Sequence, residues 1–230
     1  FPKAIFRLEH PISKGYYCTI SDSGKSSFSS DDIYSIRKRM QEIIALDLPI
    51  EKQEKQSKEV IRLFKERGQM DKVLLLQTLR RPYANYFELD GYPDFYSGTL
   101  LPGTGYLKNF DLLPFYDGML LRIPNRENPS VLEDMIPQSQ MFEIFKEYIE
   151  WNKIMGLSNV GDFNLACREK RTYNLIKISE ALHEKKIAAI ADQIYNLKET
   201  TRFVMISGPS SSAKTTFSKR LSVQLMVNGL

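Results

Sequence analysis

Cysteine and histidine are scarce in this 230-residue chain, which has two of each. Cys18 and Cys167 lie far apart and belong to no C-x-x-C pair. Their spacing excludes both a disulfide framework and a zinc site built on thiolates. We expect both cysteines to be reduced and buried, where each packs as a small apolar side chain. His10 precedes a proline and His183 lies in a predicted helix, so we expect structural or surface histidines rather than metal ligands.

An excess of one charge and long apolar runs are also lacking. The 32 Lys and Arg against 28 Asp and Glu leave a net charge of +4, which is too small to require a nucleic-acid or lipid partner. No stretch approaches the roughly 18 apolar residues of a membrane helix, and residues 1–10 lack the order of a signal peptide. We therefore expect a soluble cytoplasmic protein with no membrane contact.

The chain does contain enough apolar residues to form a hydrophobic core. Hydrophobic residues make up 42% of the chain and aromatic residues 11%, which excludes disordered and fibrous classes. Residues 1–123 have the pattern of an α+β domain, with an extended stretch at 6–20 that turns near residues 13–15. Ser29 and Asp32 have the spacing of a capping box, which predicts a helix that must end before Pro49.

Strand signals dominate the rest of this domain. Residues 50–56 are predicted to form a strand, and Ser57 to cap a short helix after it. Another helix is expected from about Asp71. The Tyr, Phe, Gly and Pro content of residues 83–123, with turn signals at Asp90-Gly91 and Asp117-Gly118, predicts antiparallel hairpins.

Residues 124–200 are predicted to be a linker followed by a helical connector. Three prolines and two asparagines between residues 124 and 137 favour a connection. Apolar residues then recur at helical spacing over residues 140–155 and 173–198, and Thr172 is predicted to cap the second helix. Five side chains are expected to be buried, namely Phe145, Tyr148, Ile187, Ile190 and Ile194.

The sharpest chemical signal lies in residues 201–230. An apolar stretch at residues 202–207 has the pattern of a buried strand, and it leads into a loop and a helix. Gly208, Lys214 and Thr215 occupy their places in the pattern G-x-x-x-x-G-K-[ST], while Ala213 replaces the second glycine. This order is typical of the phosphate loop of a P-loop α/β domain.

The loop pattern predicts an ATP site with Mg²⁺. Backbone N–H groups of such a loop converge on phosphate oxygens at the positive end of the helix dipole. Lys214 is the predicted catalytic cation on the phosphates, and the Thr215 hydroxyl is the predicted Mg²⁺ ligand. The predicted nucleotide-binding residues are Gly208, Ser210, Ser211, Ser212, Ala213, Lys214, Thr215 and Thr216. Because phosphoryl transfer also needs an acidic group and an acceptor site, we interpret the chain as the start of a longer enzyme that is inactive alone.

The helix and loop together resemble a known family. Residues 179–192, followed by residues 202–230 with their Gly-Pro-Ser-Ser-Ser-x-Lys-Thr-Thr run, are similar to bacterial uridine-kinase-like nucleoside kinases. That family has glycine where this chain has Ala213. The resemblance implies that the complete protein phosphorylates a nucleoside with ATP and Mg²⁺.

Residues 1–123 resemble a different family. The segments that carry the resemblance are residues 14–20, 31–52 and 94–105, the last leading to 110–113. They are similar to the second N-terminal domain of threonyl-tRNA synthetases, an editing domain shared with alanyl-tRNA synthetases. This resemblance implies an α+β fold.

The editing family carries a Cys-x-x-x-His pair in the third of these segments. In this chain the two positions hold Tyr96 and Leu100, and the earlier His-x-x-x-His pair would fall before Phe1. A phenol and an isobutyl group cannot replace a thiolate and an imidazole as zinc ligands. We therefore predict no zinc and no zinc-dependent deacylation, and expect a binding or regulatory domain.

Two functions remain as alternatives. The first is a uridine-type nucleoside kinase. The second is an RNA-binding or regulatory module attached to a degenerate NTP site. Aromatic residues between Tyr83 and Tyr116 could stack on bases, although only Arg80, Arg81 and Lys108 supply positive charge among them. Filling a core is the alternative role for these rings. The charged run from Lys52 to Arg67 is expected to be a solvated face.

Overall fold

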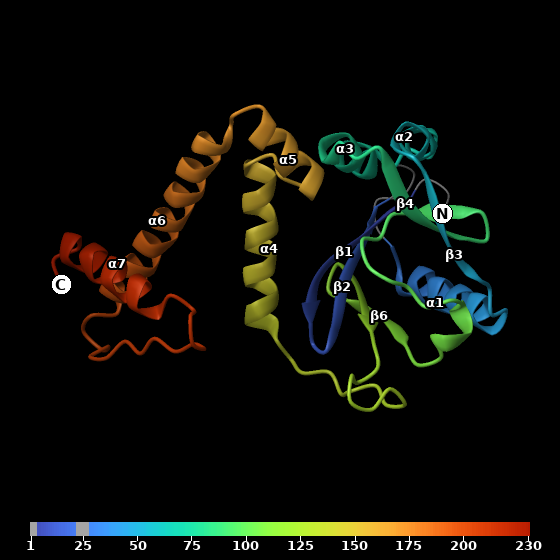
Figure 1. Ribbon diagram of the computed structural model, residues 1–230. Coiled ribbons are helices and arrows are strands. Elements are labelled where there is room, and N and C mark those ends of the chain that lie inside the picture. Colours follow the sequence, from blue (N-terminus) through green and yellow to red (C-terminus); the bar gives the residue numbers. More distant parts are fainter. Residues whose placement is uncertain (1–3, 22–27) are drawn as a thin grey trace. The chain divides into compact units, whose positions relative to one another are not determined.

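The computed structural model describes residues 4–21 and 28–230 (Figure 1). Most of the loop expected between Ser21 and Ser30 therefore lies outside the described residues. The chain divides into two compact units, one of residues 1–150 with 159–161 and one of residues 151–158 with 162–230. Among the described residues, no helix has both the length and the apolar character needed to cross a membrane.

The first unit is α+β, as predicted, but it contains two antiparallel sheets rather than one. The first sheet has four strands in the order β1 (Ile5–Ile12), β2 (Gly15–Ser21), β7 (Gly118–Arg122) and β6 (Asp111–Phe115). Ser13 and Lys14 form the two-residue turn between β1 and β2, both with positive φ, as a type I′ turn requires. A Cβ on Gly15 would lie 2.5 Å from the Leu121 carbonyl oxygen, so this position requires glycine.

Helix α1 (Ser30–Ala45) covers part of this sheet. The predicted capping box is confirmed, because the Asp32 N–H donates to Ser29 Oγ and the Ser29 N–H donates to Asp32 Oδ2. Ile33 is the buried residue of the helix, and it packs with Cys18, Leu112 and Met119 of the sheet. Burial raises the pKa of the Cys18 thiol to about 11. Cys167, which was expected to be buried, is exposed.

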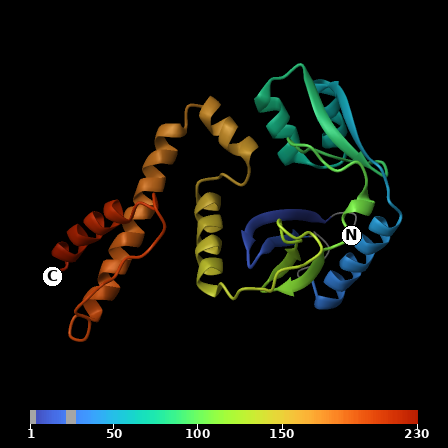
Figure 2. The ribbon, with the colours of Figure 1, turned by 60° about the horizontal axis from the view of Figure 1, so that its bottom comes forward.

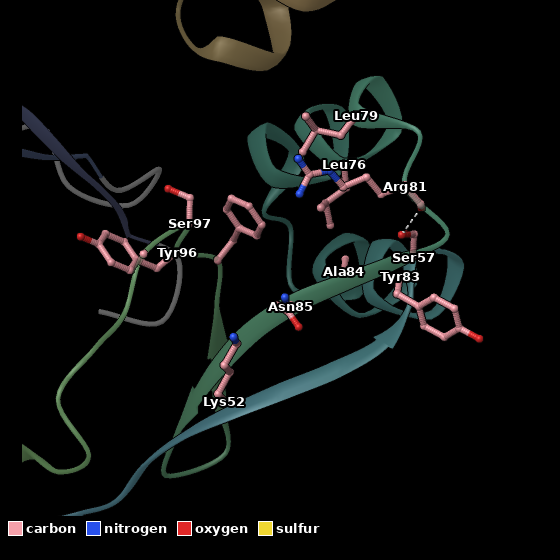
Figure 3. A pocket seen from close by; sticks show the side chains of 12 residues that line it. Lys52, Ser57, Leu76, Leu79, Arg81, Tyr83, Ala84, Asn85, Tyr96 and Ser97 are labelled. Carbon is pink, nitrogen blue, oxygen red and sulfur yellow. Dashed lines mark hydrogen bonds between the residues drawn. The ribbon is translucent and has the colours of Figure 1, made fainter.

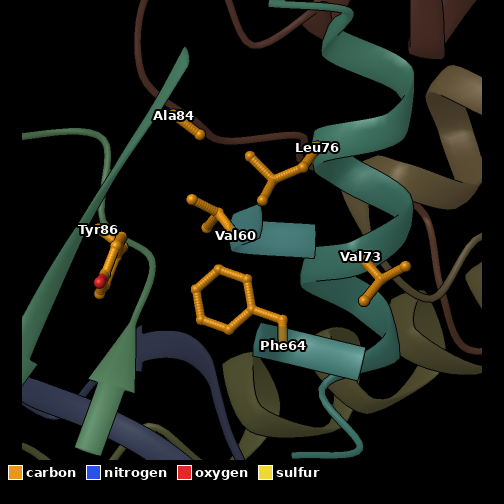
Figure 4. Close-up of a cluster of buried hydrophobic side chains, with 6 residues drawn as sticks. All are labelled: Val60, Phe64, Val73, Leu76, Ala84 and Tyr86. Atoms are coloured by element: carbon orange, nitrogen blue, oxygen red, sulfur yellow. The ribbon is translucent and has the colours of Figure 1, made fainter. Parts of the chain in front are cut away.

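The second sheet has the order β3 (Ile50–Gln56), β4 (Tyr83–Leu89) and β5 (Tyr92–Asp94). Helices α2 (Ser57–Glu66) and α3 (Met70–Leu79) pack against it (Figure 2). Ser57 is the first residue of α2 rather than its cap. The core between helices and sheet is formed by Val60, Phe64, Val73, Leu76, Ala84 and Tyr86 (Figure 4).

A buried threonine joins the end of α1 to the chain that follows the second sheet. Thr104 opens the short helix η1 (Thr104–Tyr106) and is 3% exposed. Its hydroxyl accepts from the Leu48 N–H and donates to the Ile43 carbonyl, both at 2.9 Å. The Gly105 N–H donates to Asp47 Oδ1 at 2.8 Å. These bonds hold η1 against the turn after α1.

The predicted linker is bonded to the first sheet. Ser13 lies in the turn between β1 and β2. Its N–H donates to Gln138 Oε1 at 2.9 Å, and its hydroxyl donates to the Ile136 carbonyl. Lys14 pairs with Glu133 at 3.4 Å. Helix α4 (Ser139–Ile154) follows, and its Phe142 is fully buried with Tyr17 and Leu120.

The second unit contains α5 (Val160–Arg168), α6 (Thr172–Asn196) and α7 (Lys214–Val227). The two long connector helices occur as predicted, but Thr172 is the first residue of α6 rather than its cap, which is Arg171. Helix α5 was not predicted. Ile187 and Ala191 of α6 are buried with Leu221 of α7. Tyr148, expected to be buried, is 58% exposed, and Ile190 is half-buried.

The strand predicted at residues 202–207 does not form. Phe203 and Met205 are 88% and 94% exposed, and no described strand pairs with this segment. A parallel strand obtains its backbone hydrogen bonds from neighbouring strands, and both sheets of the described chain belong to the first unit. The P-loop α/β domain is therefore not shown.

The core of the second sheet gives a stability prediction. Because Phe64 is fully buried beside Tyr86, replacing it with alanine should lower the free energy of unfolding by about 3–5 kcal/mol. Phe203→Ala, at an exposed position, should change it by less than about 0.5 kcal/mol. Urea unfolding followed by circular dichroism measures both. Equal losses in the two variants would contradict the assignment of Phe64 to the core.

Candidate functional site

The loop at Gly208–Thr216 folds back on itself. Lys214 begins α7, and its Nζ donates to the carbonyl oxygens of Gly208 at 2.9 Å and Pro209 at 2.5 Å. The Ser212 hydroxyl also donates to the Pro209 carbonyl, at 2.9 Å. The structure therefore brings Gly208, Ser212 and Lys214 together, without a strand in front of them.

The start of α7 has the electrostatics of an anion site. Ala213 is its N-cap residue and makes no side-chain cap, so this side chain does not block the first-turn N–H groups. Thr215 and Thr216 are exposed in that turn. Ala213 has φ of 57° and Ser211 has φ of 61°, and this left-handed conformation costs a residue with Cβ about 1 kcal/mol. The glycine of the usual pattern avoids that cost.

A pocket in the first unit offers a second candidate site. Its volume is about 130 Å³, and it lies between the end of α3, strand β4 and the loop after β5 (Figure 3). Leu76, Ala84 and Phe95 give it an apolar wall. The polar and aromatic groups that line it are Lys52, Ser57, Arg81, Tyr83, Asn85, Tyr96 and Ser97.

Two aromatic residues of the lining, Tyr83 and Tyr96, are exposed, and their rings point outward on opposite sides of the pocket (Figure 3). Tyr96 is 51% exposed and Tyr83 is 57% exposed. The ring of Tyr96 lies against Gly98, where a Cβ would come within 2.7 Å of Tyr96 Cε1. Arg81 is exposed, and its carbonyl accepts a hydrogen bond from the Ser57 hydroxyl. The pocket therefore combines exposed aromatic rings with positive charge, as sites for single-stranded nucleic acid do.

The positions of the editing family's metal pair lie in the loop beside this pocket. Tyr96 lines the pocket and Leu100, 37% exposed, follows it. Neither side chain is a zinc ligand. Asp94 is paired with Lys72 and accepts from the Phe95 N–H. Among the described residues, no group of three His, Cys, Asp or Glu side chains could hold a metal ion.

Sequence analysis did not assign Lys52, Ser57 or Asn85 to a site. They come from β3, α2 and β4, and only the fold brings them to one pocket. The pair of Lys72 with Asp94 was also missed. No local pattern marks it, because the two residues lie on α3 and β5.

His10 is buried in an aromatic cluster of the first unit. Its ring stacks on Phe145 with centroids 4.1 Å apart and lies 5.3 Å from Tyr17. Burial lowers the pKa of His10 below its usual value. The Tyr17 hydroxyl donates to Asp117 Oδ1 at 2.6 Å, and this bond lowers the pKa of Asp117.

Comparison with known proteins gives relatives for part of the chain. No family model matches it. It is 40% identical over 105 residues to threonine–tRNA ligase of Syntrophotalea carbinolica, which covers 46% of this chain and 16% of that protein. The enzymes of the same name from Carboxydothermus hydrogenoformans and Geobacter sp. strain M21 are 34% and 31% identical, over 49% of this chain and 18% and 17% of theirs. The chain thus spans about a sixth of the length of the relatives it matches.

These relatives support a threonyl-tRNA synthetase-type domain in the chain. They contradict the prediction that the protein is a uridine-type nucleoside kinase, because the relatives that match are named threonine–tRNA ligases. The kinase prediction is therefore wrong, and the nucleoside substrate has no support. The kinase prediction had rested on the loop at residues 208–216 and on the resemblance of residues 179–192 and 202–230 to nucleoside kinases. The alternative, an RNA-binding module, agrees better with the relatives.

The side chains at positions 96 and 100 give a prediction about metal. Since Tyr96 and Leu100 replace a thiolate and an imidazole, the chain purified without chelator should hold well below one zinc per molecule. Atomic emission spectrometry measures the ratio. One zinc per chain, lost in a Tyr96→Ala variant, would contradict our alignment with the editing family.

Proposed function

We propose that residues 1–123 form an RNA-binding module, and that its pocket beside Tyr96 holds an unpaired nucleotide. The observation that carries the proposal is the combination of exposed rings and cations at one pocket. Tyr83 and Tyr96 offer faces for a base, while Lys52 and Arg81 offer charge for a phosphate. Proteins recognise single-stranded RNA largely through such stacking and phosphate contacts.

The relatives narrow the class of RNA. Their names specify a tRNA ligase, so we propose tRNA as the RNA that this module binds. Tyr96 and Leu100 supply no metal ligand, and the module binds RNA without zinc-dependent editing. Its role is then recognition or regulation.

We propose further that the loop Gly208–Thr216 binds the phosphates of a nucleotide. Ala213 leaves the start of α7 without a side-chain cap. The Lys214 ammonium group donates to carbonyl oxygens of the loop, and it could exchange these bonds for bonds to phosphate oxygens. The proposed binding residues are Gly208, Ser210, Ser211, Ser212, Ala213, Lys214, Thr215 and Thr216. With ATP bound, Thr215 would hold Mg²⁺, which screens the phosphate charge. No phosphoryl transfer is proposed for this site.

Substitutions in the pocket test RNA binding. Tyr96→Ala should weaken binding of a fluorescent tRNA about tenfold or more, since one stacked base contributes about 1–3 kcal/mol. Arg81→Ala should weaken binding and reduce the salt slope by about 0.7, the value for one lost phosphate contact on a single strand. Fluorescence anisotropy across a salt series measures both quantities on the full chain.

Matched controls come from the same unit. Tyr106 is 67% exposed and lies outside the pocket, so Tyr106→Ala controls for the loss of an exposed ring. Arg126→Ala, at an exposed position outside the pocket, controls for the loss of one charge. If the four variants and the wild type bind tRNA with equal affinity, the pocket is not the RNA site.

Substitutions in the loop test nucleotide binding. Lys214→Ala should weaken ATP binding at least about tenfold, because a cation on the phosphates is lost. Ala213→Gly should tighten binding, because glycine adopts the left-handed conformation without strain. Isothermal titration calorimetry with and without Mg²⁺ measures both, and Lys219→Ala, an exposed lysine of the same helix, is the control. ATP affinity unchanged by Lys214→Ala would contradict the proposal.

A further inference from the structure

We propose that protonation of His10 releases the first half of α4, residues 139–150, from the first sheet. His10 is 7% exposed and lies where α4 meets this sheet. Its ring stacks on Phe145 of α4 and lies 6.2 Å from Phe142 of the same helix. Tyr17 of β2, Phe115 of β6 and Tyr116 after it belong to the same aromatic cluster.

The imidazole is suited to this position only in its neutral form. Nε2 of His10 has no hydrogen-bond partner among the described residues. Protonation would place an N–H on both ring nitrogens, and the N–H at Nε2 would then be buried without an acceptor. A buried donor that loses water without gaining an acceptor destabilises the packed state.

Nearby charges do not compensate the imidazolium. The titratable groups around His10 come from three elements and one turn, namely Glu9 on β1, Tyr17 on β2, Lys146 on α4 and Asp117 between β6 and β7. Glu9 raises the pKa of His10, but the lowering by burial is larger. Glu9 already accepts from the Thr19 hydroxyl, and Asp117 already binds Tyr17 and Lys146.

Release would be confined to the helix. The chain before α4 is held separately, since Ser13 bonds to Gln138 and to the Ile136 carbonyl. In α4, in contrast, Phe145 stacks on His10, and Phe142 packs on Tyr17, Phe115 and Tyr116 of the same cluster. Residues 151–154 at the end of α4 belong to the second unit and are not part of the released segment.

The sign of the pH dependence follows from linkage. His10 in the packed state has a pKa below the ordinary value of 6.5, whereas in the released state it is hydrated and titrates near that value. The released state therefore binds more protons. The contribution of neutral His10 to the packing of α4 is complete well above pH 6.5. Below pH 6.5 the equilibrium constant for packing falls by at most about tenfold per pH unit, until His10 is also protonated in the packed state.

Amide hydrogen exchange on the full chain tests the proposal. Between about pH 7.5 and about pH 5, and after correction for intrinsic exchange rates, the amides of residues 139–150 should lose protection by up to about tenfold per pH unit below 6.5. In His10→Phe, whose ring stays neutral, their protection should not change with pH. His183→Phe removes the other histidine of the chain and should behave as wild type.

Two outcomes overturn the proposal. The first is the same pH dependence of residues 139–150 in wild type and in His10→Phe. The second is an equal loss of protection in β2 and β7, which would indicate that the whole first unit unfolds. His10→Leu repeats the measurement with a smaller neutral side chain if phenylalanine does not fit the cluster, and its profile must also be flat with pH.

Discussion

The buried hydroxyl of Thr104 is the contact on which the candidate pocket depends. It binds the Leu48 N–H and the Ile43 carbonyl and so fixes the chain that returns from the second sheet. At the other end of that loop, Phe95 packs against the core of α2 and α3. Because Phe95 and Thr104 hold the two ends of this loop, the residues between them, including Tyr96, have a fixed position beside the pocket. A buried, fully bonded hydroxyl is costly to remove, because its partners would be left unsatisfied.

At residues 208–216 the phosphate-loop pattern is present without the strand that should precede it. A helix follows the loop, as the pattern predicts, and it begins at Lys214. The strand expected before the loop is absent, because the described chain offers residues 202–207 no strand to pair with. A phosphate loop needs only a helix start and free N–H groups to attract an anion. Group transfer also needs a metal partner and an acceptor site, so the loop and the helix before it were weak evidence for a kinase.

Local signals accounted for much of the fold. The predictable elements were the Ser29 and Asp32 capping box, the 50–56 strand and the two long connector helices. Each of them is determined by residues that lie close together in the sequence. The turn between β6 and β7 was displaced by one residue, to Tyr116 and Asp117. The pocket could not be predicted, since Lys52 of β3, Arg81 after α3 and Tyr96 after β5 are brought together only when α3 packs against the second sheet. Periodicity likewise does not reveal that Tyr148 faces water.

Stacking, rather than charge, determines how such a pocket selects its ligand. A net charge of +4 spread over 32 cations and 28 anions attracts RNA only weakly. Lys52 and Arg81 would therefore contribute a modest affinity that falls with salt, equally for any sequence. A base stacked on the exposed ring of Tyr96 would gain energy that salt does not screen. Because a base inside a duplex cannot stack on a side chain in this way, the proposed module would favour an unpaired nucleotide over paired RNA.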